Sequence, residues 1–239
     1  MIFCLSQLHT GTWSTIAWLT LHDEVKGLML SMDVYDVLEG KPTIDQMHES
    51  GSYHQKFDPL MVYHEHIRPD HWFQERMSRT QLVLAATNPT VIPIRDPLLS
   101  LISYQNRAEI HHKIGTDGFL PVEHVLNRWV YLAESFEILS RYDHIQFLCW
   151  DIIGFNPEPT LWGIARNLGL TDREPSTRGL QLRDNSTGEY ALKSAYAARN
   201  VHALRQGVAK DGFQQLVNRE RILRPFLEGI GYTNLLWWS

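Results

Sequence analysis

Residues 1–19 read MIFCLSQLHTGTWSTIAWL, an order of apolar and polar residues that predicts a strand, a turn and a helix. Met1–Leu5 is an uncharged apolar run, which is typical of a strand buried on both faces in a parallel sheet. From Trp13 onward, apolar residues recur with helical spacing. The N-terminus of such a helix attracts anions, and Gly11 lets the backbone approach a ligand closely. The stretch therefore predicts an anion-binding turn.

Thr10 and Thr12 flank Gly11 in this turn and offer hydroxyl groups to the same anion. The signal is weak by itself, because a glycine and a capping threonine also occur in ordinary turns between a strand and a helix. The chain contains neither the G-x-x-x-x-G-K-[ST] pattern of a Walker A loop nor the G-x-G-x-x-G dinucleotide pattern. The interpretation of the turn therefore depends on residues further along the chain.

The rest of the chain alternates between the two kinds of secondary structure. Further apolar runs predict strands over residues 27–32, 60–63, 90–94 and 145–150. Periodic segments and caps predict helices over residues 69–86, 97–110, 121–142, 159–168 and 213–227. This alternation predicts one α/β domain over residues 1–239, with three layers, a mainly parallel central sheet flanked by helices, and a resemblance to the P-loop NTPase architecture.

Composition narrows the class of protein. The net charge of −5 over 239 residues disfavours general nucleic-acid binding. No apolar stretch is long enough to cross a membrane, and the N-terminus lacks the basic region of a signal peptide. Cys4 and Cys149 both fall in predicted buried strands, which fits a reducing compartment. These features predict a cytoplasmic protein without disulfides, and they leave the oligomeric state open.

Ligands of parallel α/β sheets bind beyond the carboxyl ends of the strands. Five residues with suitable side chains lie at the carboxyl ends of predicted strands in this chain: His9, His64, His66, Arg95 and Trp150.

Two segments resemble motifs of the PAPS-dependent sulfotransferases, which use 3′-phosphoadenosine 5′-phosphosulfate (PAPS) as sulfuryl donor and release the bisphosphate PAP. Residues 8–13, LHTGTW, resemble the phosphosulfate loop P-K-[ST]-G-T-[ST] of that family. His64-Glu65-His66, with Pro69 shortly after, resembles the K-T-H-x-P-like segment that carries the catalytic histidine.

Two later segments match further motifs of the family in the same order. Arg95 with Ser103, eight residues on, resembles the motif that binds the 3′-phosphate. Trp150-Asp151 with Asn156-Pro157 resembles the aromatic–acidic strand end that is followed by Asn-Pro. The resemblance covers roughly residues 1–170.

The resemblance implies in-line transfer of a sulfuryl group from PAPS to a hydroxyl or an amine, with no covalent intermediate and no metal. His66 is the implied base, because a neutral imidazole accepts a proton near pH 7. The implied donor contacts divide between the turn, the strand ends and a loose C-terminal clamp: His9, Thr10, Gly11, Thr12, Trp13, Arg95, Ser103, Trp150, Arg178 and Gly179. Arg95 and Ser103 would hold the 3′-phosphate, and Trp150 would stack on the adenine.

The chain also departs from the family. His9 stands where the family has a lysine, and a protonated His9 would stabilise the leaving phosphate. His64 replaces a second lysine, and with His48 and His54 it is assigned to the acceptor, a small molecule or a glycan that the sequence does not identify.

Other interpretations stay open. One alternative is a phosphotransferase that uses a nucleoside triphosphate, and another is a catalytically inactive PAP-binding protein. His64 and His66 with His71 form a third alternative, a metal site, because alternate residues of a strand share one face. His66 as a purely structural residue is the last.

Overall fold

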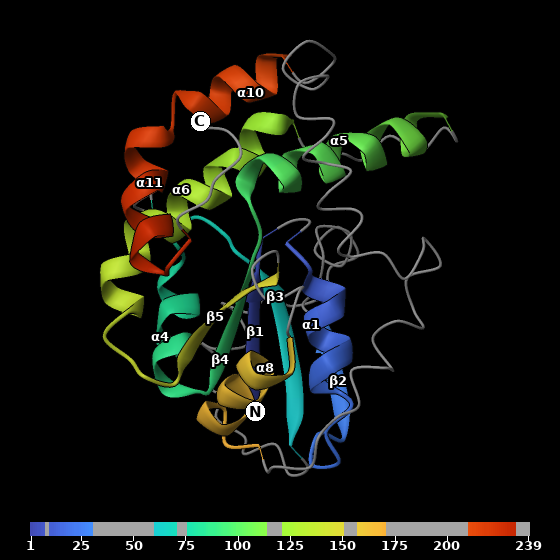
Figure 1. Cartoon of the computed structure of the whole chain (residues 1–239), viewed down its shortest axis with the longest axis vertical. Helices are drawn as coiled ribbons and strands as arrows, with labels where there is room; N and C mark the ends of the chain where they lie inside the picture. Colours follow the sequence, from blue (N-terminus) through green and yellow to red (C-terminus); the bar gives the residue numbers. More distant parts are fainter. Residues whose placement is uncertain are drawn as a thin grey trace.

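The computed structural model describes residues 1–7, 10–30, 60–70, 76–113, 121–150, 157–170 and 210–232 (Figure 1). Nine residues of the motifs and sites predicted above lie outside these ranges: Leu8, His9, His48, His54, His71, Asp151, Asn156, Arg178 and Gly179.

Five parallel strands form one sheet in the order β2-β3-β1-β4-β5. The strands are β1 (Ile2–Ser6), β2 (Gly27–Leu30), β3 (Met61–His66), β4 (Thr90–Ile94) and β5 (Ile145–Cys149). The predicted parallel sheet is thus confirmed, with strand ends that differ by up to three residues. After β3 the chain crosses to the other side of β1, so the strand order reverses between β1 and β4. In open α/β sheets such a reversal marks the ligand crevice.

β1 and β4 pair over a short length. β1 pairs with β4 only at Phe3 with Thr90 and at Cys4 with Val91, whereas β4 pairs with β5 along all five residues. Pro93 has no backbone N–H to donate to a neighbouring strand. Toward their carboxyl ends, β1 and β4 are therefore not in register with each other, although each stays paired with its other neighbour.

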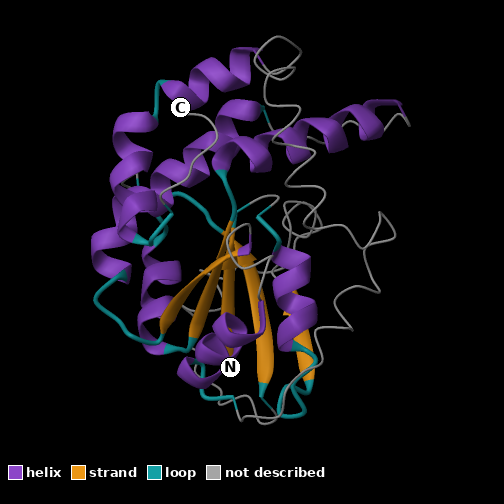
Figure 2. Cartoon of the chain, in the orientation of Figure 1, coloured by secondary structure: helices purple, strands orange, loops and turns teal. Residues whose placement is uncertain are grey.

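Helices cover both faces of the sheet and complete three layers (Figure 2). One face packs against α1 (Thr12–Leu19) and α8 (Pro157–Asn167) through the side chains of Ile2 and Cys4. The other face, which includes Phe3 and Leu5, packs against α4 (Arg79–Thr87), α6 (Val122–Leu139), α10 (Lys210–Val217) and α11 (Glu220–Gly229). The alternation of β1 side chains thus divides the core into two clusters.

The helix α5 (Pro97–Lys113) starts directly after β4 and runs along the upper edge of the molecule in Figure 1. Asp96 caps it, because its Oδ1 accepts hydrogen bonds from the backbone N–H of Leu98 (2.7 Å) and Leu99 (3.4 Å). α5 continues three residues beyond the predicted end at residue 110. Among the described helices, none is long and apolar enough to cross a membrane.

The prediction of a helix from Pro69 to Ala86 was wrong at its start. Pro69 instead bridges Met77 in antiparallel fashion, and Asp70 N–H donates to the Arg76 carbonyl (2.7 Å). α4 begins only at Arg79, whose N–H donates to Asp70 Oδ2 (3.2 Å). A proline followed by an acid is typical of a first helical turn, but here the acid serves a helix nine residues further on.

The predicted helix over residues 213–227 was also wrong in its bounds. Two helices, α10 and α11, replace it, and they meet at Asn218 and Arg219. Arg219 Nη1 donates back to the Gln215 carbonyl (2.9 Å) and Arg219 Nη2 donates to Asn127 Oδ1 on α6 (2.8 Å). A tertiary contact thus holds this turn, which no local pattern indicated.

Candidate active site

The turn between β1 and α1 leaves the N-terminus of α1 uncapped. Gly11 is the residue before the helix and adopts a left-handed conformation with φ 90°, which favours glycine. Within the described residues no side chain caps α1, and its first turn carries no acidic residue. The first N–H groups of a helix lack partners within the helix, and the macrodipole places positive charge at this end. The geometry therefore suits a bound anion.

Threonine hydroxyl groups stabilise this turn by hydrogen bonds to its backbone carbonyls. Thr10 Oγ1 donates to the Gln7 carbonyl (3.0 Å), and Thr12 Oγ1 donates to the same oxygen (3.4 Å). Thr15 Oγ1 donates to the Gly11 carbonyl (3.0 Å). The contacts of Thr10 and Thr12 with a donor phosphate stay predictions, as do those of Trp13, which lies in the first turn of α1.

Gln7 carries an unsatisfied amide beside this turn. Its side chain is fully buried, and neither Nε2 nor Oε1 has a hydrogen-bond partner in the described part of the chain. Leaving a buried polar group without a partner costs about 1–3 kcal/mol.

Trp150, at the end of β5, lies directly on Gly11. A Cβ atom added to Gly11 would come within 2.5 Å of Trp150 Cδ1, and Trp150 Nε1 donates to Thr15 Oγ1 (2.8 Å). Gly11 is thus required both by its φ and by the ring that covers it. The indole holds the turn against α1, while its predicted stacking on an adenine stays a prediction.

His64 and His66 meet at the end of β3, on the face that α1 covers. Their rings are T-shaped with centroids 4.8 Å apart, and both contact the hydroxyl of Ser6 on β1. Ser6 Oγ lies 2.9 Å from His64 Nε2 and 3.1 Å from His66 Nδ1. The parallel register produces this cluster, because it sets Ser6 opposite His66 and Cys4 opposite His64.

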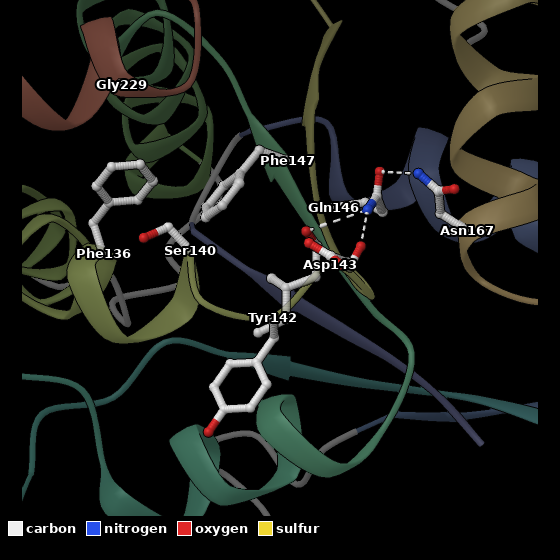
Figure 3. A pocket seen from close by; sticks show the side chains of 9 residues that line it. Phe136, Ser140, Tyr142, Asp143, Gln146, Phe147, Asn167 and Gly229 are labelled. Atoms are coloured by element: carbon white, nitrogen blue, oxygen red, sulfur yellow. Dashed lines mark hydrogen bonds between the residues drawn. The ribbon is translucent and has the colours of Figure 1, made fainter.

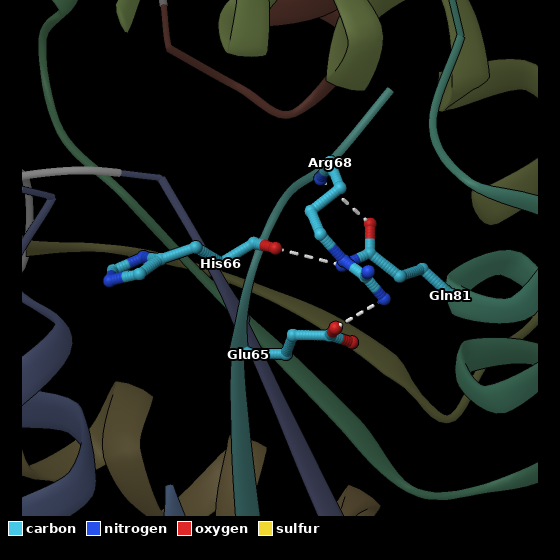
Figure 4. A network of polar contacts seen from close by, with 4 residues as sticks. All are labelled: Glu65, His66, Arg68 and Gln81. Atoms are coloured by element: carbon cyan, nitrogen blue, oxygen red, sulfur yellow. Dashed lines mark hydrogen bonds and ion pairs between the residues drawn. The ribbon is translucent and has the colours of Figure 1, made fainter. Parts of the chain in front are cut away.

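The backbone of His66 is held from the opposite face. Gln81 Nε2 donates to the His66 carbonyl (2.8 Å), and Gln81 Oε1 accepts from Arg68 N–H (2.9 Å). Arg68 Nη2 also pairs with the buried Glu65 Oε1 (2.6 Å). Figure 4 shows the His66 ring directed away from this network. The imidazole therefore projects from a backbone that is fixed on its other side.

Arg95 and Ser103 belong to the junction of β4 and α5. Arg95 directly follows β4, Ser103 lies in the second turn of α5, and both side chains are partly exposed. Parallel strands end at one edge of the sheet, so Arg95 lies at the same edge as Ser6 and the Gly11 turn. Their joint contact with a 3′-phosphate stays a prediction.

A shallow pocket of about 480 Å³ lies at the opposite edge, where β5 begins (Figure 3). It is lined by Phe136, Ser140, Tyr142, Asp143, Ile145, Gln146, Phe147, Asn167 and Gly229. It contains none of the predicted site residues. In the described residues, no group of three or more His, Cys, Asp or Glu side chains is placed to hold a metal ion.

Comparisons with known proteins bear on the fold. The structure is similar to the crystal structure of mouse sulfotransferase SULT7A1 complexed with PAP, with a TM-score of 0.52 and 11% sequence identity over 95% of this chain and 88% of that one. This chain has a sulfotransferase fold. A sulfotransferase from Alicyclobacillus acidocaldarius is also similar, with a TM-score of 0.46 and 11% identity over 93% of this chain and 95% of that one. No protein-family model matches the sequence, and no curated protein matches it.

Within this sulfotransferase fold, the sequence motifs missed three buried residues that shape the site. Ser6 joins the two histidines, Gln7 carries the unsatisfied amide, and Gln81 holds the His66 backbone. Ser6 and Gln7 stand at the end of an apolar run, which is a weak signal for a site. Nothing in the sequence indicated Gln81, because its partners are backbone groups 13 and 15 residues away.

Proposed function

We propose that this protein transfers the sulfuryl group of PAPS to a hydroxyl or an amine of an acceptor, and releases PAP. The observation that carries the proposal is the uncapped N-terminus of α1 behind Gly11, at the point where the strand order reverses, in a chain with a sulfotransferase fold. A phosphosulfate offers the charge that such a turn attracts.

In the proposed reaction the acceptor oxygen or nitrogen attacks sulfur in line with the bond to the leaving phosphate. His66 takes the acceptor proton as the new bond to sulfur forms, and the bond from sulfur to the phosphate oxygen breaks. The backbone N–H groups at the start of α1, with a protonated His9, would stabilise the negative charge that builds on that oxygen. Such transfers depend mainly on positioning and electrostatics, which a rigid strand end supplies.

In the same proposal the far end of the donor lies at the β4–α5 junction. The guanidinium of Arg95 offers a planar fork to the 3′-phosphate, and the Ser103 hydroxyl offers another donor to the same group. Trp150 would stack on the adenine, and it would also hold the Gly11 turn in place.

A second candidate is a protein that binds PAP without turnover. The observation that favours it is the histidine at position 9, where the related enzymes carry a lysine. A histidine is only partly protonated near neutral pH, so its stabilisation of a leaving phosphate is conditional. The third candidate, a phosphotransferase, lacks a Walker lysine.

Calorimetric titration with PAP, with ATP plus Mg²⁺ and with AMP tests the nucleotide site. We expect selective binding of PAP by the wild-type protein and its loss in Arg95→Ala, because a buried phosphate then loses its bidentate partner. Arg141→Ala is the matched control, since this exposed arginine pairs with Glu137 and precedes β5 at the other edge of the sheet.

The possible outcomes separate the candidates. Binding of ATP with Mg²⁺ but not PAP would favour the phosphotransferase, and binding of none of the three nucleotides would remove the nucleotide site. If PAP binds, incubation with PAPS and a panel of phenols, sugars and amines distinguishes an enzyme from a binding protein. PAP release with any acceptor supports the enzyme.

A further inference from the structure

β5 forms one end of the strand order, so the described sheet continues on only one of its two sides. It pairs with β4, and the hydrogen bond from Thr90 N–H to the His144 carbonyl (3.0 Å) sets the phase of that pairing. In a parallel pair, alternate residues direct both backbone groups to the same neighbour, so residues 146 and 148 face β4 and Phe147 faces away from it. The outer side of β5 thus presents the N–H and the C=O of Phe147.

The shallow pocket at the start of β5 lies along this outer side (Figure 3). Asn167, from α8 on one face of the sheet, lines it together with Phe136 of α6 and Gly229 of α11 from the other face. A pocket that contacts β5 and helices of both layers can lie only where the sheet stops. The Asn167 amide donates to Gln146 Oε1 (3.0 Å), which fixes the end of α8 against β5 on this side.

The walls of the pocket suit a side chain with an apolar stem and a cationic head, as lysine and arginine have. The rings of Phe136 and Phe147 have centroids 5.7 Å apart, and both side chains are partly exposed. Asp143 is the one charged residue among the nine described residues that line the pocket, and its side chain is exposed. In Figure 3 the two rings lie to the left of the Asp143 carboxylate. The nearby Arg141 pairs with Glu137 (2.6 Å), so it does not neutralise that carboxylate.

The sequence of β5 lacks the residues that usually protect an exposed strand. Ile145–Cys149 reads IQFLC, with neither a proline nor a charge. The exposed side of such a strand pairs readily with an extended peptide, whose backbone supplies the missing hydrogen bonds. A small cation would gain only a surface ion pair, which binds weakly. The backbone groups and the pocket together therefore favour a peptide over a small cation.

We propose that the outer side of β5 binds an extended basic segment of a partner protein as an added antiparallel strand. Phe147 N–H donates to one residue of that segment, and Phe147 C=O accepts from the N–H of the same residue. A lysine or arginine side chain of the segment enters the pocket, where its carbon chain packs on Phe136 and its cation pairs with Asp143. The inference is independent of the proposed function, because the Gly11 turn lies at the carboxyl ends of the strands and the pocket lies where β5 begins.

A titration of the full chain with the peptide acetyl-TVRVT-amide tests the proposal. Selective labelling with ¹⁵N-phenylalanine leaves nine backbone signals, and Phe147→Leu assigns one of them to Phe147. We expect the Phe147 signal to shift on binding and the hydrogen exchange of this amide to slow. Asp143→Asn should weaken the binding about threefold, because it removes the charge that faces the arginine. Glu123→Gln is the matched control, since this exposed acid lies in the first turn of α6 and does not line the pocket.

A second peptide, acetyl-TVQVT-amide, isolates the ion pair with Asp143. The wild-type protein should bind it about threefold more weakly than the arginine peptide. Asp143→Asn should bind the two peptides equally, because the variant and the glutamine peptide each remove the same interaction. A preference for the arginine peptide that persists in Asp143→Asn would contradict the assigned ion pair.

Four further results would overturn the proposal. One is the absence of any change in the Phe147 signal at about 1 mM peptide. Binding of arginine amide as tightly as the peptide would indicate a small-cation site instead. Protection of the Phe147 amide that rises with protein concentration, without peptide, would assign the outer side of β5 to a second copy of this chain. Equal losses in Asp143→Asn and Glu123→Gln would remove the pocket from the interaction. These spectra need no nucleotide, so they are separate from the test of PAP binding.

Discussion

The two faces of the sheet end differently at the edge where the site lies. On the face that α1 and α8 cover, β1 and β3 end in Ser6, His64 and His66, side chains with exchangeable protons. On the face that α4 and α6 cover, β3 ends with Glu65, which is buried and paired with Arg68. The first face thus carries serine and histidine side chains beside the N-terminus of α1. The second face carries the ion pair of Glu65 and Arg68 and the side-chain amide of Gln81, which bonds to the backbone.

The difference indicates a division of work between the faces. The first face has the groups that we propose bind and react, and the second fixes the backbone from which His66 projects. Changes on the first face should affect ligand binding, and changes on the second should mainly affect the free energy of unfolding. Substitutions on each face test that division.

Gly11→Ala should have the largest effect, because it adds strain and a clash on the first face. A left-handed alanine costs about 1–2 kcal/mol, and overpacking against Trp150 costs about 1–3 kcal/mol more. We expect the free energy of unfolding to fall by about 2–5 kcal/mol and PAP affinity to fall by about tenfold or more. Urea denaturation and calorimetry with PAP measure the two effects.

Gly169→Ala is the matched control for this variant. Gly169, which follows α8, has φ 77°, but no neighbouring atom of the described residues lies within 4 Å of an added Cβ. Gly169→Ala should lower the free energy of unfolding only by the cost of a left-handed alanine, and it should leave PAP affinity unchanged. Equal losses of PAP affinity in both variants would show that Gly11 has no special part in binding.

Gln81→Ala should have an intermediate effect that is confined to stability. It leaves the His66 carbonyl and the Arg68 N–H without their partner, which costs about 1–3 kcal/mol in urea denaturation. PAP affinity should change little, because Gln81 lies on the second face.

Gln214→Ala is the control, since the exposed amide of Gln214 bonds only to Asn218 in the described part of the chain and its loss should cost less than about 0.5 kcal/mol. A large loss of PAP affinity in Gln81→Ala would contradict the division between faces.

His22→Leu should have the smallest effect on the free energy of unfolding, and the effect should be present only at acidic pH. His22 follows α1, is 4% exposed, and neither ring nitrogen has a hydrogen-bond partner in the described residues. Burial lowers its pKa, and the nearby Glu24 and Asp23 oppose that shift only in part. The unfolded chain therefore binds a proton that the folded chain does not, so stability falls as the pH drops below about 6.5.

Urea denaturation at about pH 7.5 and about pH 5.5 measures this effect, and the pH dependence should shrink by on the order of 1 kcal/mol in His22→Leu. His124→Leu, at an exposed position on α6, should leave it unchanged. An unaltered acid dependence in His22→Leu would mean that other groups cause it.

The fold was predictable from local patterns to a large extent. Each apolar run that predicted a strand forms one, and the strand from Thr90 to Ile94 has the predicted bounds. The errors lie where distant contacts decide a boundary. Asp70 serves α4 from outside the helix, and Arg219 holds the turn between α10 and α11 through Asn127.

The candidate site was predictable only in part. Asp96 caps α5, a local role that the sequence pattern indicates, and Gly11 has the left-handed φ that favours glycine, while its contact with an anion stays a prediction. The cover of Gly11 by Trp150 joins residues 139 positions apart, and it appears only when β5 and α1 pack together.

The sequence by itself determined the alternation of strands and helices, the glycine of the turn between β1 and α1 and the presence of histidines at a strand end. These features arise from short-range preferences of the backbone and from the period of apolar residues. Only the tertiary structure decided that Ser6 lies between His64 and His66, because the register of two parallel strands depends on the packing of the whole sheet rather than on either strand. A shift of that register by one residue would turn Ser6 away from the pair.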